Sequence, residues 1–406
     1  MRLGLCGLLI RLARALLIVV SVVIVFFAIS ARSQDSSTGA VRGFVSDASG
    51  GRLGRCSVGL ANNATGIVRS AFSSNDGSFA FELLPPGEYS LHTDFPGMSP
   101  GLIPSLRVEV GGSLQLDLRL QIAGTNETVN VSDSPTMVET KTSEVASVIE
   151  ERAISDLPLN GRRFSDLALL TPGVTQDPRG LTSATNGDLA FGGIRGYQSS
   201  FLVDGADNNN SFFGQARGRY RAPYQFSNEV VQEFRVSSNS YGAELGRAGG
   251  AVINVVTKSG TNHMHGTAFY YLRDSLFNAQ HAFADVKPSD RQHQFGFTVG
   301  GPIRRNRAFF YGGFDQHIFR VPTLVRFGDG RAAVVPQPGN YPIVPPDYEA
   351  SDQATVFAAA SQLSNLGGDF RSSLLGNAGF FKVDLNLSSR NFLNLRVNTS
   401  RYYGFQ

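Results

Sequence analysis

Two groups of side chains in this sequence have types and spacings that suggest chemistry. His263 and His265 are one residue apart, which would place both imidazoles on one face of a β-strand, as in a metal site. No third ligand residue lies near them in the sequence, so we predict no metal. The second group is the basic cluster of Arg217, Arg219 and Arg221. It would suit an anionic ligand, but a solvated loop or the wall of a polar lumen explains it equally well.

No pattern in the sequence indicates catalysis or a bound cofactor. Acidic residues are scattered among turns, and no nucleophile–base constellation can be argued. The glycines at Gly192, Gly193 and Gly196 are not followed by the Lys-Ser/Thr of a phosphate-binding loop, and no His-x-x-Glu zinc motif occurs. We therefore predict a protein that is not an enzyme and needs no cofactor. A secreted hydrolase would need a catalytic cluster that this sequence lacks.

The composition favours a β-rich protein of several domains. The chain has 406 residues, enough for about two or three domains. It contains 45 Gly, 30 Phe, 12 Tyr and no Trp, which is typical of turn-rich β structure. Its net charge is only +3, so we expect no nucleic-acid partner.

The first residues have the features of an export signal. Arg2, Arg11 and Arg14 precede an apolar run at residues 16–29, and small residues follow it. We predict a cleaved signal peptide over residues 1–33, the alternative being an uncleaved anchor helix. Cleavage would leave Cys56 alone, as a buried, inert thiol. No later segment is apolar for about 18 consecutive residues, so a membrane role would require a closed β-barrel.

Residues 39–122 have the pattern of a small β-sandwich. Turn clusters separate seven short β-rich runs, at residues 40–45, 56–61, 66–72, 79–83, 89–93, 106–110 and 114–120. The last run alternates apolar and polar residues strictly, so one face should be buried. The stretch from Ser74 to Tyr89, with an Asp-Gly turn, alternating Phe and a Pro-Gly turn, resembles the carboxypeptidase regulatory-like domain. That resemblance implies a transthyretin-like sandwich and no peptidase activity.

Residues 135–262 contain a different set of motifs. The apolar spacing of residues 144–157 predicts a helix ended by Pro158, and residues 165–170 predict a second helical run. Five motifs follow in order, Leu157-Pro-Leu-Asn-Gly-Arg162, Gly193-Ile-Arg195, Asp204-Gly-Ala-Asp-Asn208, Glu233-Phe-Arg-Val236 and Gly249-Gly-Ala-Val-Ile-Asn-Val-Val-Thr-Lys-Ser-Gly-Thr-Asn262. This set resembles the plug domain of TonB-dependent receptors of the Oar-like branch, with Arg163 standing where the family usually has Asn.

Residues 263–406 alternate in the manner of membrane-barrel strands. We predict strands near residues 265–273, 292–303, 307–319, 378–388 and 391–402, with apolar residues on one face and polar residues on the other. The connections alternate between long and very short, as the two ends of an outer-membrane barrel do. The opening of this region also resembles the start of the Oar-like barrel. The predicted fold class is thus mainly β: a sandwich, an α+β plug and the first strands of an incomplete barrel.

The resemblance implies functions for particular residues. In the linker of residues 123–134, the segment Glu127, Thr128, Val129, Asn130 and Val131 resembles a TonB box, the short strand that TonB adds to its own sheet. The alternative is that it is the last strand of the sandwich. The plug motifs imply internal polar contacts for Arg195, Asp204, Asp207 and Asn208, and a buried ion pair of Arg195 with Asp204 is favoured over ligand contact.

The resemblance implies energised uptake across an outer membrane. TonB would be the energy-coupling partner, outer-membrane lipid would surround the barrel, and the sandwich would lie in the periplasm. The extracellular ligand would be of the oligosaccharide, peptide or siderophore class. Such barrels have about 22 strands, and five cannot close, so we expect an N-terminal fragment that is unable to transport alone. The alternative is an exported adhesive or carbohydrate-binding sandwich protein without transport.

Overall fold

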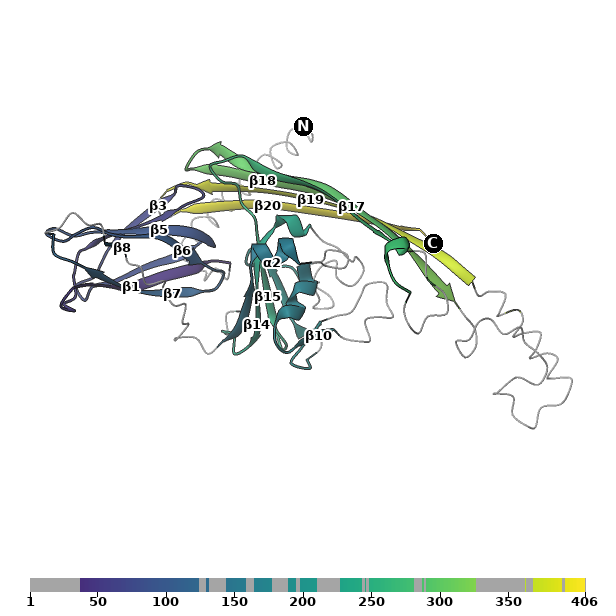
Figure 1. The fold of residues 1–406 in the computed structure, drawn as a ribbon, viewed down its shortest axis with the longest axis horizontal. Helices are drawn as coiled ribbons and strands as arrows, with labels where there is room; N and C mark the ends of the chain where they lie inside the picture. The colour runs from purple at the N-terminus through teal and green to yellow at the C-terminus, as the bar shows by residue number, and fades with distance from the viewer. Residues whose placement is uncertain are drawn as a thin grey trace, which may run out of the picture. The chain divides into compact units, whose positions relative to one another are not determined.

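The structure is a computed structural model of a mainly β protein, as the sequence predicts (Figure 1). It describes residues 37–123, 129–130, 144–157, 164–176, 189–194, 198–209, 227–242, 245, 248–280, 287, 290–325, 362, 368–388 and 391–405. The predicted signal peptide lies outside these residues. Within the described part, the helices are all too short or too polar to cross a membrane.

The N-terminal sandwich consists of two sheets. One has the order β4-β1-β7 and the other the order β3-β2-β5-β6-β8. The strands are β1 (Gly39–Asp47), β2 (Ser57–Asn62), β3 (Val68–Phe72), β4 (Ser78–Leu84), β5 (Gly87–Asp94), β6 (Gly101–Val108), β7 (Ser113–Leu120) and β8 (Val129–Asn130). The seven predicted runs all correspond to strands, and β1 pairs with β7 in parallel.

The alternation of β7 builds the sandwich core. Leu114, Leu116, Leu118 and Leu120 are buried while the residues between them are exposed. Cys56 is also fully buried, and burial raises the pKa of its thiol. The turn that follows β4 is held by Tyr89, whose hydroxyl donates to the Pro85 carbonyl oxygen over 2.7 Å. The predicted Pro-Gly turn is therefore anchored to the core.

The region that we call the plug centres on a sheet of order β13-β12-β15-β14-β9. Its strands are β9 (Val145–Ile149), β12 (Ser200–Val203), β13 (Ala206–Asp207), β14 (Val231–Asn239) and β15 (Val252–Thr257). The smaller elements are β10 (Val174–Gln176) paired with β11 (Leu189–Phe191), α2 (Glu151–Asp156), and the 3-10 turns η2 (Phe164–Leu170) and η5 (Asn228–Val230). Every residue of β15, the central strand, is buried.

The helix predicted over residues 144–157 is wrong in its first half. Val145–Ile149 forms strand β9, which pairs antiparallel with β14, and the helix α2 begins only at Glu151. The β-branched side chains in β9 favour a strand, and the edge of β14 supplies the backbone partners. The second helical run, predicted at residues 165–170, is a 3-10 helix.

Five long strands form a meander that we call the wall sheet, of order β16-β17-β18-β19-β20. They are β16 (His265–Asp274), β17 (Arg291–Arg304), β18 (Ala308–Val325), β19 (Gly368–Asn386) and β20 (Phe392–Phe405); η7 (Ser275–Phe277) follows β16. Figure 1 shows β17 to β20 side by side. β18 and β19 are longer than predicted, because their backbone pairing continues to Val325↔Gly368, beyond the alternating segments.

The two faces of β7 provide a test of the sandwich core. We expect Leu116→Ala to destabilise the sandwich by about 2–5 kcal/mol, because it leaves a cavity in a packed core. Asp117→Ala, the neighbouring change on the exposed face, should alter stability by no more than about 0.5 kcal/mol. Pulse proteolysis of the whole chain in increasing urea measures both. Equal midpoints for the two variants would contradict the assigned faces.

Candidate functional site

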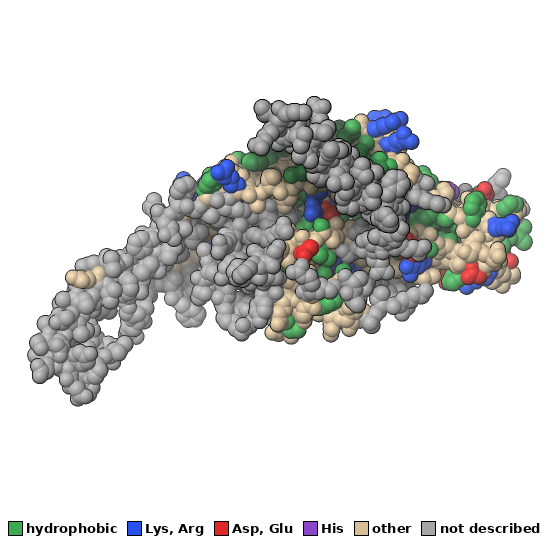
Figure 2. Space-filling view, turned by 180° about the vertical axis from the view of Figure 1, so that it is seen from behind, with side chains coloured by type: hydrophobic (Ala, Val, Ile, Leu, Met, Phe, Trp, Pro, Cys, Tyr) green, Lys and Arg blue, Asp and Glu red, His purple; other side chains and the backbone are tan. Residues whose placement is uncertain are grey.

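The wall sheet presents an apolar face away from the plug. Directly paired residues of an antiparallel sheet share a face, so the registers Tyr270↔Phe295, Phe297↔Phe314 and Phe381↔Val397 assign one set of side chains to one surface. The exposed members of this outward set are Tyr270, Leu272, Phe295, Phe297, Val299, Phe314, Phe381, Leu393, Leu395 and Val397. Figure 2 shows hydrophobic side chains exposed at the molecular surface.

The opposite face of the wall sheet covers the plug. Tyr311 and Phe380 belong to the same buried cluster as the plug residues Phe234 and Ile253. Tyr311 also donates its hydroxyl to the Glu229 carbonyl oxygen over 3.2 Å. Polar side chains are buried on this face too: Gln294, Thr298, Asp315, His317, Lys382 and Asp384. The face that meets the plug is therefore mixed, whereas the exposed large side chains of the outward face are apolar.

Asp204 is the centre of an ion network between the plug and the wall sheet. Its Oδ2 atom accepts from Arg396 Nη1 over 2.6 Å, and its Oδ1 atom lies 3.9 Å from Lys382 Nζ. The same carboxylate accepts from the backbone N–H and the hydroxyl of Thr257, over 2.8 and 2.7 Å. Lys382 in turn donates to the Thr257 carbonyl oxygen over 3.0 Å. One carboxylate thus links β15 of the plug to β19 and β20 of the wall sheet.

The backbone at Asp204 explains why this residue type stands there. Val203 pairs with Ala206, so only Asp204 and Gly205 connect β12 to β13. Both have positive φ, 46° and 75°, as a two-residue type I′ hairpin requires. Asp and Gly tolerate this conformation better than most residues. The Asp-Gly dipeptide of the predicted motif therefore sets both the turn and the place of the carboxylate.

The residues after this turn form a local hydrogen-bond cluster. Asp207 is exposed, and its Oδ1 atom accepts from the backbone N–H and the side-chain amide of Asn209. Asn208 donates its backbone N–H to the Phe201 carbonyl oxygen over 2.9 Å. Asn209 is buried and accepts from the Phe201 backbone N–H over 2.9 Å. The predicted residues Asp207 and Asn208 thus lie beside Asn209, which is the buried member of the cluster.

Several predicted site residues lie outside the described part of the chain. These are Arg195, the basic cluster Arg217, Arg219 and Arg221, and the TonB-box residues Glu127, Thr128 and Val131. The two described residues of that segment form β8, which pairs in parallel with β6 through Gly101↔Val129 and Leu102↔Asn130. Val129 and Asn130 thus lie at the edge of a sandwich sheet, where the alternative prediction would also place them.

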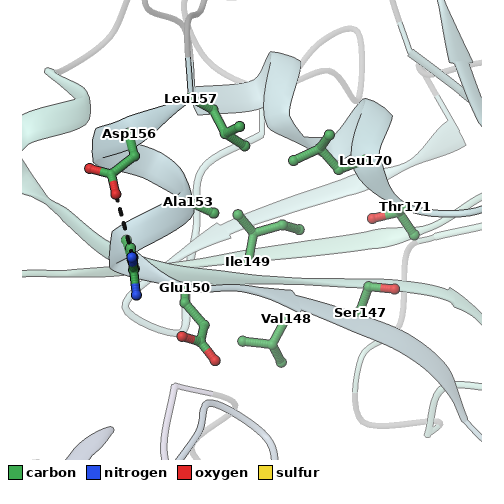
Figure 3. A pocket seen from close by; sticks show the side chains of 10 residues that line it. Ser147, Val148, Ile149, Glu150, Ala153, Asp156, Leu157, Leu170 and Thr171 are labelled. Atoms are coloured by element: carbon green, nitrogen blue, oxygen red, sulfur yellow. Dashed lines mark ion pairs between the residues drawn. The ribbon is translucent and has the colours of Figure 1, made fainter.

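An open groove of about 560 Å³ lies between β9, α2 and η2. Its apolar lining includes Val148, Ile149, Leu157 and Leu170, and an Arg152–Asp156 ion pair of 3.5 Å lies at its side (Figure 3). The lining has no His or Cys and offers no nucleophile–base pair. Across the described residues, no cluster of three or more His, Cys, Asp or Glu could hold a metal.

The histidine pair has a local structural role. His265 Nδ1 lies 3.0 Å from the His263 carbonyl oxygen and 3.3 Å from Thr261 Oγ1. Its ring lies beside that of Tyr311, with centroids 5.8 Å apart. These contacts fix the junction at which the chain leaves the plug and enters β16.

Comparison with known proteins supports the relationships that the motifs predict. Residues 40–121 match the family model of the carboxypeptidase regulatory-like domain, and residues 256–327 match that of an outer membrane beta barrel domain. The TonB-dependent transporter Oar of Myxococcus xanthus is 25% identical over 267 residues, covering 62% of this chain and 23% of that protein. The chain therefore spans about a quarter of the length of this curated relative. The predicted resemblance to Oar-like TonB-dependent transporters is confirmed.

Solved structures of outer-membrane proteins are also similar to this chain. The siderophore receptor PirA of Acinetobacter baumannii is 18% identical, with a TM-score of 0.41, covering 64% of this chain and 32% of the receptor. The outer membrane transporter YddB of Escherichia coli is 14% identical, with a TM-score of 0.44, covering 63% and 32%. The relatives named here are transporters or receptors.

The Asp204 network leads to a prediction about the attachment of the plug. Asp204→Asn keeps the turn but removes the charge that faces Lys382 and Arg396, at a cost of roughly 1–3 kcal/mol. We expect faster hydrogen exchange at the Thr257 amide, which donates to this carboxylate. The control is Asp207→Asn, the same change at an exposed neighbour. An equal effect of both variants at Thr257 would show that the charge of Asp204 does not matter.

Proposed function

We propose that this chain forms the periplasmic sandwich, the plug and part of the barrel wall of a TonB-dependent outer-membrane receptor. The receptor would take up an extracellular ligand of the oligosaccharide, peptide or siderophore class. Energy would come from TonB in the inner membrane, which would pull on the linker of residues 123–134. No nucleotide site or catalytic group is needed for this role, because the energy arrives through a protein partner.

The observation that carries the proposal is the difference between the two faces of the wall sheet. An exposed surface of Phe, Tyr, Leu and Val over five strands would be unfavourable in water, but it suits contact with lipid. The opposite face packs on the plug core through Tyr311 and Phe380 and on Asp204 through Lys382 and Arg396. This combination favours an outer-membrane receptor over an adhesive sandwich, whose function would need neither face.

The linker supports the proposed coupling to TonB. TonB would capture residues 127–131 by adding them as a strand to its own sheet, which requires an extended segment with free backbone groups. Val129 and Asn130 are already extended as β8, and they pair with β6 at only two positions. So short an edge strand is easily detached, because few backbone hydrogen bonds hold it. Capture by TonB would replace the pairing of β8 with β6 by pairing with a strand of TonB.

The first test concerns contact with lipid. We expect Leu395→Arg to weaken insertion into the membrane by roughly 2–4 kcal/mol, because it puts a charge on the lipid-facing side of β20. Asn398→Arg is the matched control, since Asn398 lies on the opposite face of the same strand, paired with Phe380. Each variant is made in a full-length receptor whose barrel closes, and its refolding into lipid vesicles, titrated with urea, gives the two free energies. Equal losses would contradict the proposed lipid-facing surface.

The second test concerns TonB. We expect the purified periplasmic domain of TonB to bind the detergent-solubilised protein and to lose binding at least about tenfold when residues 127–131 are deleted. Val129→Pro should have a similar effect, because it removes a backbone donor. Val129→Thr is the control, since it keeps the N–H and the β-branched shape. Binding that survives the deletion would refute the TonB box, and absence of binding to the wild-type protein would favour the adhesive alternative.

A further inference from the structure

The loop between β6 and β7 of the sandwich is held by two charged side chains of the plug. Val110 is fully buried, and its backbone N–H donates to Glu233 Oε1 over 2.6 Å. Its carbonyl oxygen accepts from Arg235 Nη1 over 3.2 Å. Glu233 and Arg235 are two residues apart on β14, so their side chains lie on one face of the strand. Together they bind the backbone N–H and the carbonyl oxygen of one residue, Val110.

The charges of this contact are buried and paired. Glu233 is 2% exposed and Arg235 is 6% exposed. Arg235 Nη2 lies 3.1 Å from Glu144 Oε2, and Arg107 of β6 lies 3.8 Å from Glu233 Oε2. Burying a charge is costly unless partners replace its water. Glu233 obtains such partners from the sandwich, namely the Val110 N–H and Arg107, and these offset part of the cost of burying its carboxylate.

Two further contacts fix the orientation of the sandwich. Gln232 donates its side-chain amide to the Pro86 carbonyl oxygen over 3.0 Å. Asn262, at the exit of the plug, donates its backbone N–H to the Ala64 carbonyl oxygen over 3.0 Å and its side-chain amide to the Thr65 carbonyl oxygen over 2.7 Å. Three separated loops of the sandwich are therefore recognised through their backbones.

We propose that β14 and Asn262 form a docking surface for the chain's own sandwich, with Glu233 and Arg235 as a latch on Val110. The latch requires that the N–H and the C=O of one residue both face β14. A turn next to that residue brings the loop close to the strand. Gly111 makes this approach possible: it has a φ of +66°, and a Cβ there would lie 3.1 Å from Arg235 Cδ. The proposal does not depend on which ligand is transported.

Val110, the residue that the latch holds, lies two residues after β6, the strand that pairs with the linker. β6 pairs with β8 along one edge, and the same chain continues from β6 through Glu109 to Val110. The linker strand and the latched residue thus belong to one short stretch of the sandwich. A pull on residues 129–130 would act on β6, whose far end is attached to the plug by the latch. Docking of the sandwich and capture of the linker are therefore expected to influence each other.

Docking should depend on pH because of Glu233. Burial raises the pKa of this carboxyl to about 7; the Val110 N–H and Arg107 oppose the rise, whereas Glu109 and Glu150 add to it. In an undocked sandwich, Glu233 would regain water and its pKa would return towards 4.5. The docked form then binds the proton more tightly, so docking strengthens as the pH falls through 7. The docking constant should be about tenfold larger at pH 6 than at pH 8.

Hydrogen exchange in the intact chain tests the latch directly. The Val110 amide donates to a plug side chain, whereas the next two amides donate within the sandwich, Gly111 to Thr38 and Gly112 to Glu109. We expect Arg235→Ala and Glu233→Lys to lower the protection of Val110 at least about tenfold and to leave Gly111 and Gly112 unchanged. Loss of all three protections would mean that the sandwich itself has unfolded.

Glu233→Gln tests the latch if Arg235→Ala and Glu233→Lys do not fold. Its amide oxygen still accepts from Val110, but it does not titrate. We expect the protection of Val110, corrected for the intrinsic exchange rate, to be about tenfold greater at pH 6 than at pH 8 in the wild-type protein and equal at both in Glu233→Gln. Arg152→Ala, in an exposed ion pair of α2, is the control. The proposal fails if Val110 is protected equally in all variants, or if the wild-type protein shows no pH dependence.

Discussion

A strand whose two faces meet different surroundings must alternate its side chains, because successive Cβ atoms point in opposite directions. β18 and β19 of the wall sheet follow this constraint where they cover the plug, and the plug core depends on it. The outward face of the wall sheet exposes large apolar side chains, and its mixed face provides Tyr311 and Phe380 to the plug core. A shift of one residue in register would reverse both faces of a strand at once.

Buried ions occur where the plug meets its neighbours. Asp204 receives Arg396 and approaches Lys382 from the wall sheet, and Glu233 and Arg235 hold Val110 of the sandwich. Such contacts add little net stability, because desolvation offsets their attraction. They do specify which partner fits and how it is oriented. They also separate at a lower cost than a large apolar interface would. This suits a plug that is proposed to move during transport and a sandwich that is proposed to undock.

The sequence was informative where local patterns control structure. The strands of the sandwich and of the wall sheet follow from alternation, and the turn at Asp204 follows from its Asp-Gly dipeptide. The sequence was misleading at residues 145–149, where the apolar spacing fits a helix but the edge of β14 imposes a strand. Glu233 and Arg235 are the two charged residues of β14, at alternate positions of the strand. Their spacing marks a polar contact without identifying the partner.

The residues alone thus determined the fold class, the relationship to TonB-dependent transporters and the two faces of the wall sheet. These properties follow from periodicities and short motifs, which involve only a few neighbouring residues. The tertiary structure decided which charges meet. Arg396 reaches Asp204 from 192 positions away, and Glu233 reaches Val110 from 123 positions away. No local rule relates residues so distant in the chain, since only the folded sheets bring them within hydrogen-bond distance.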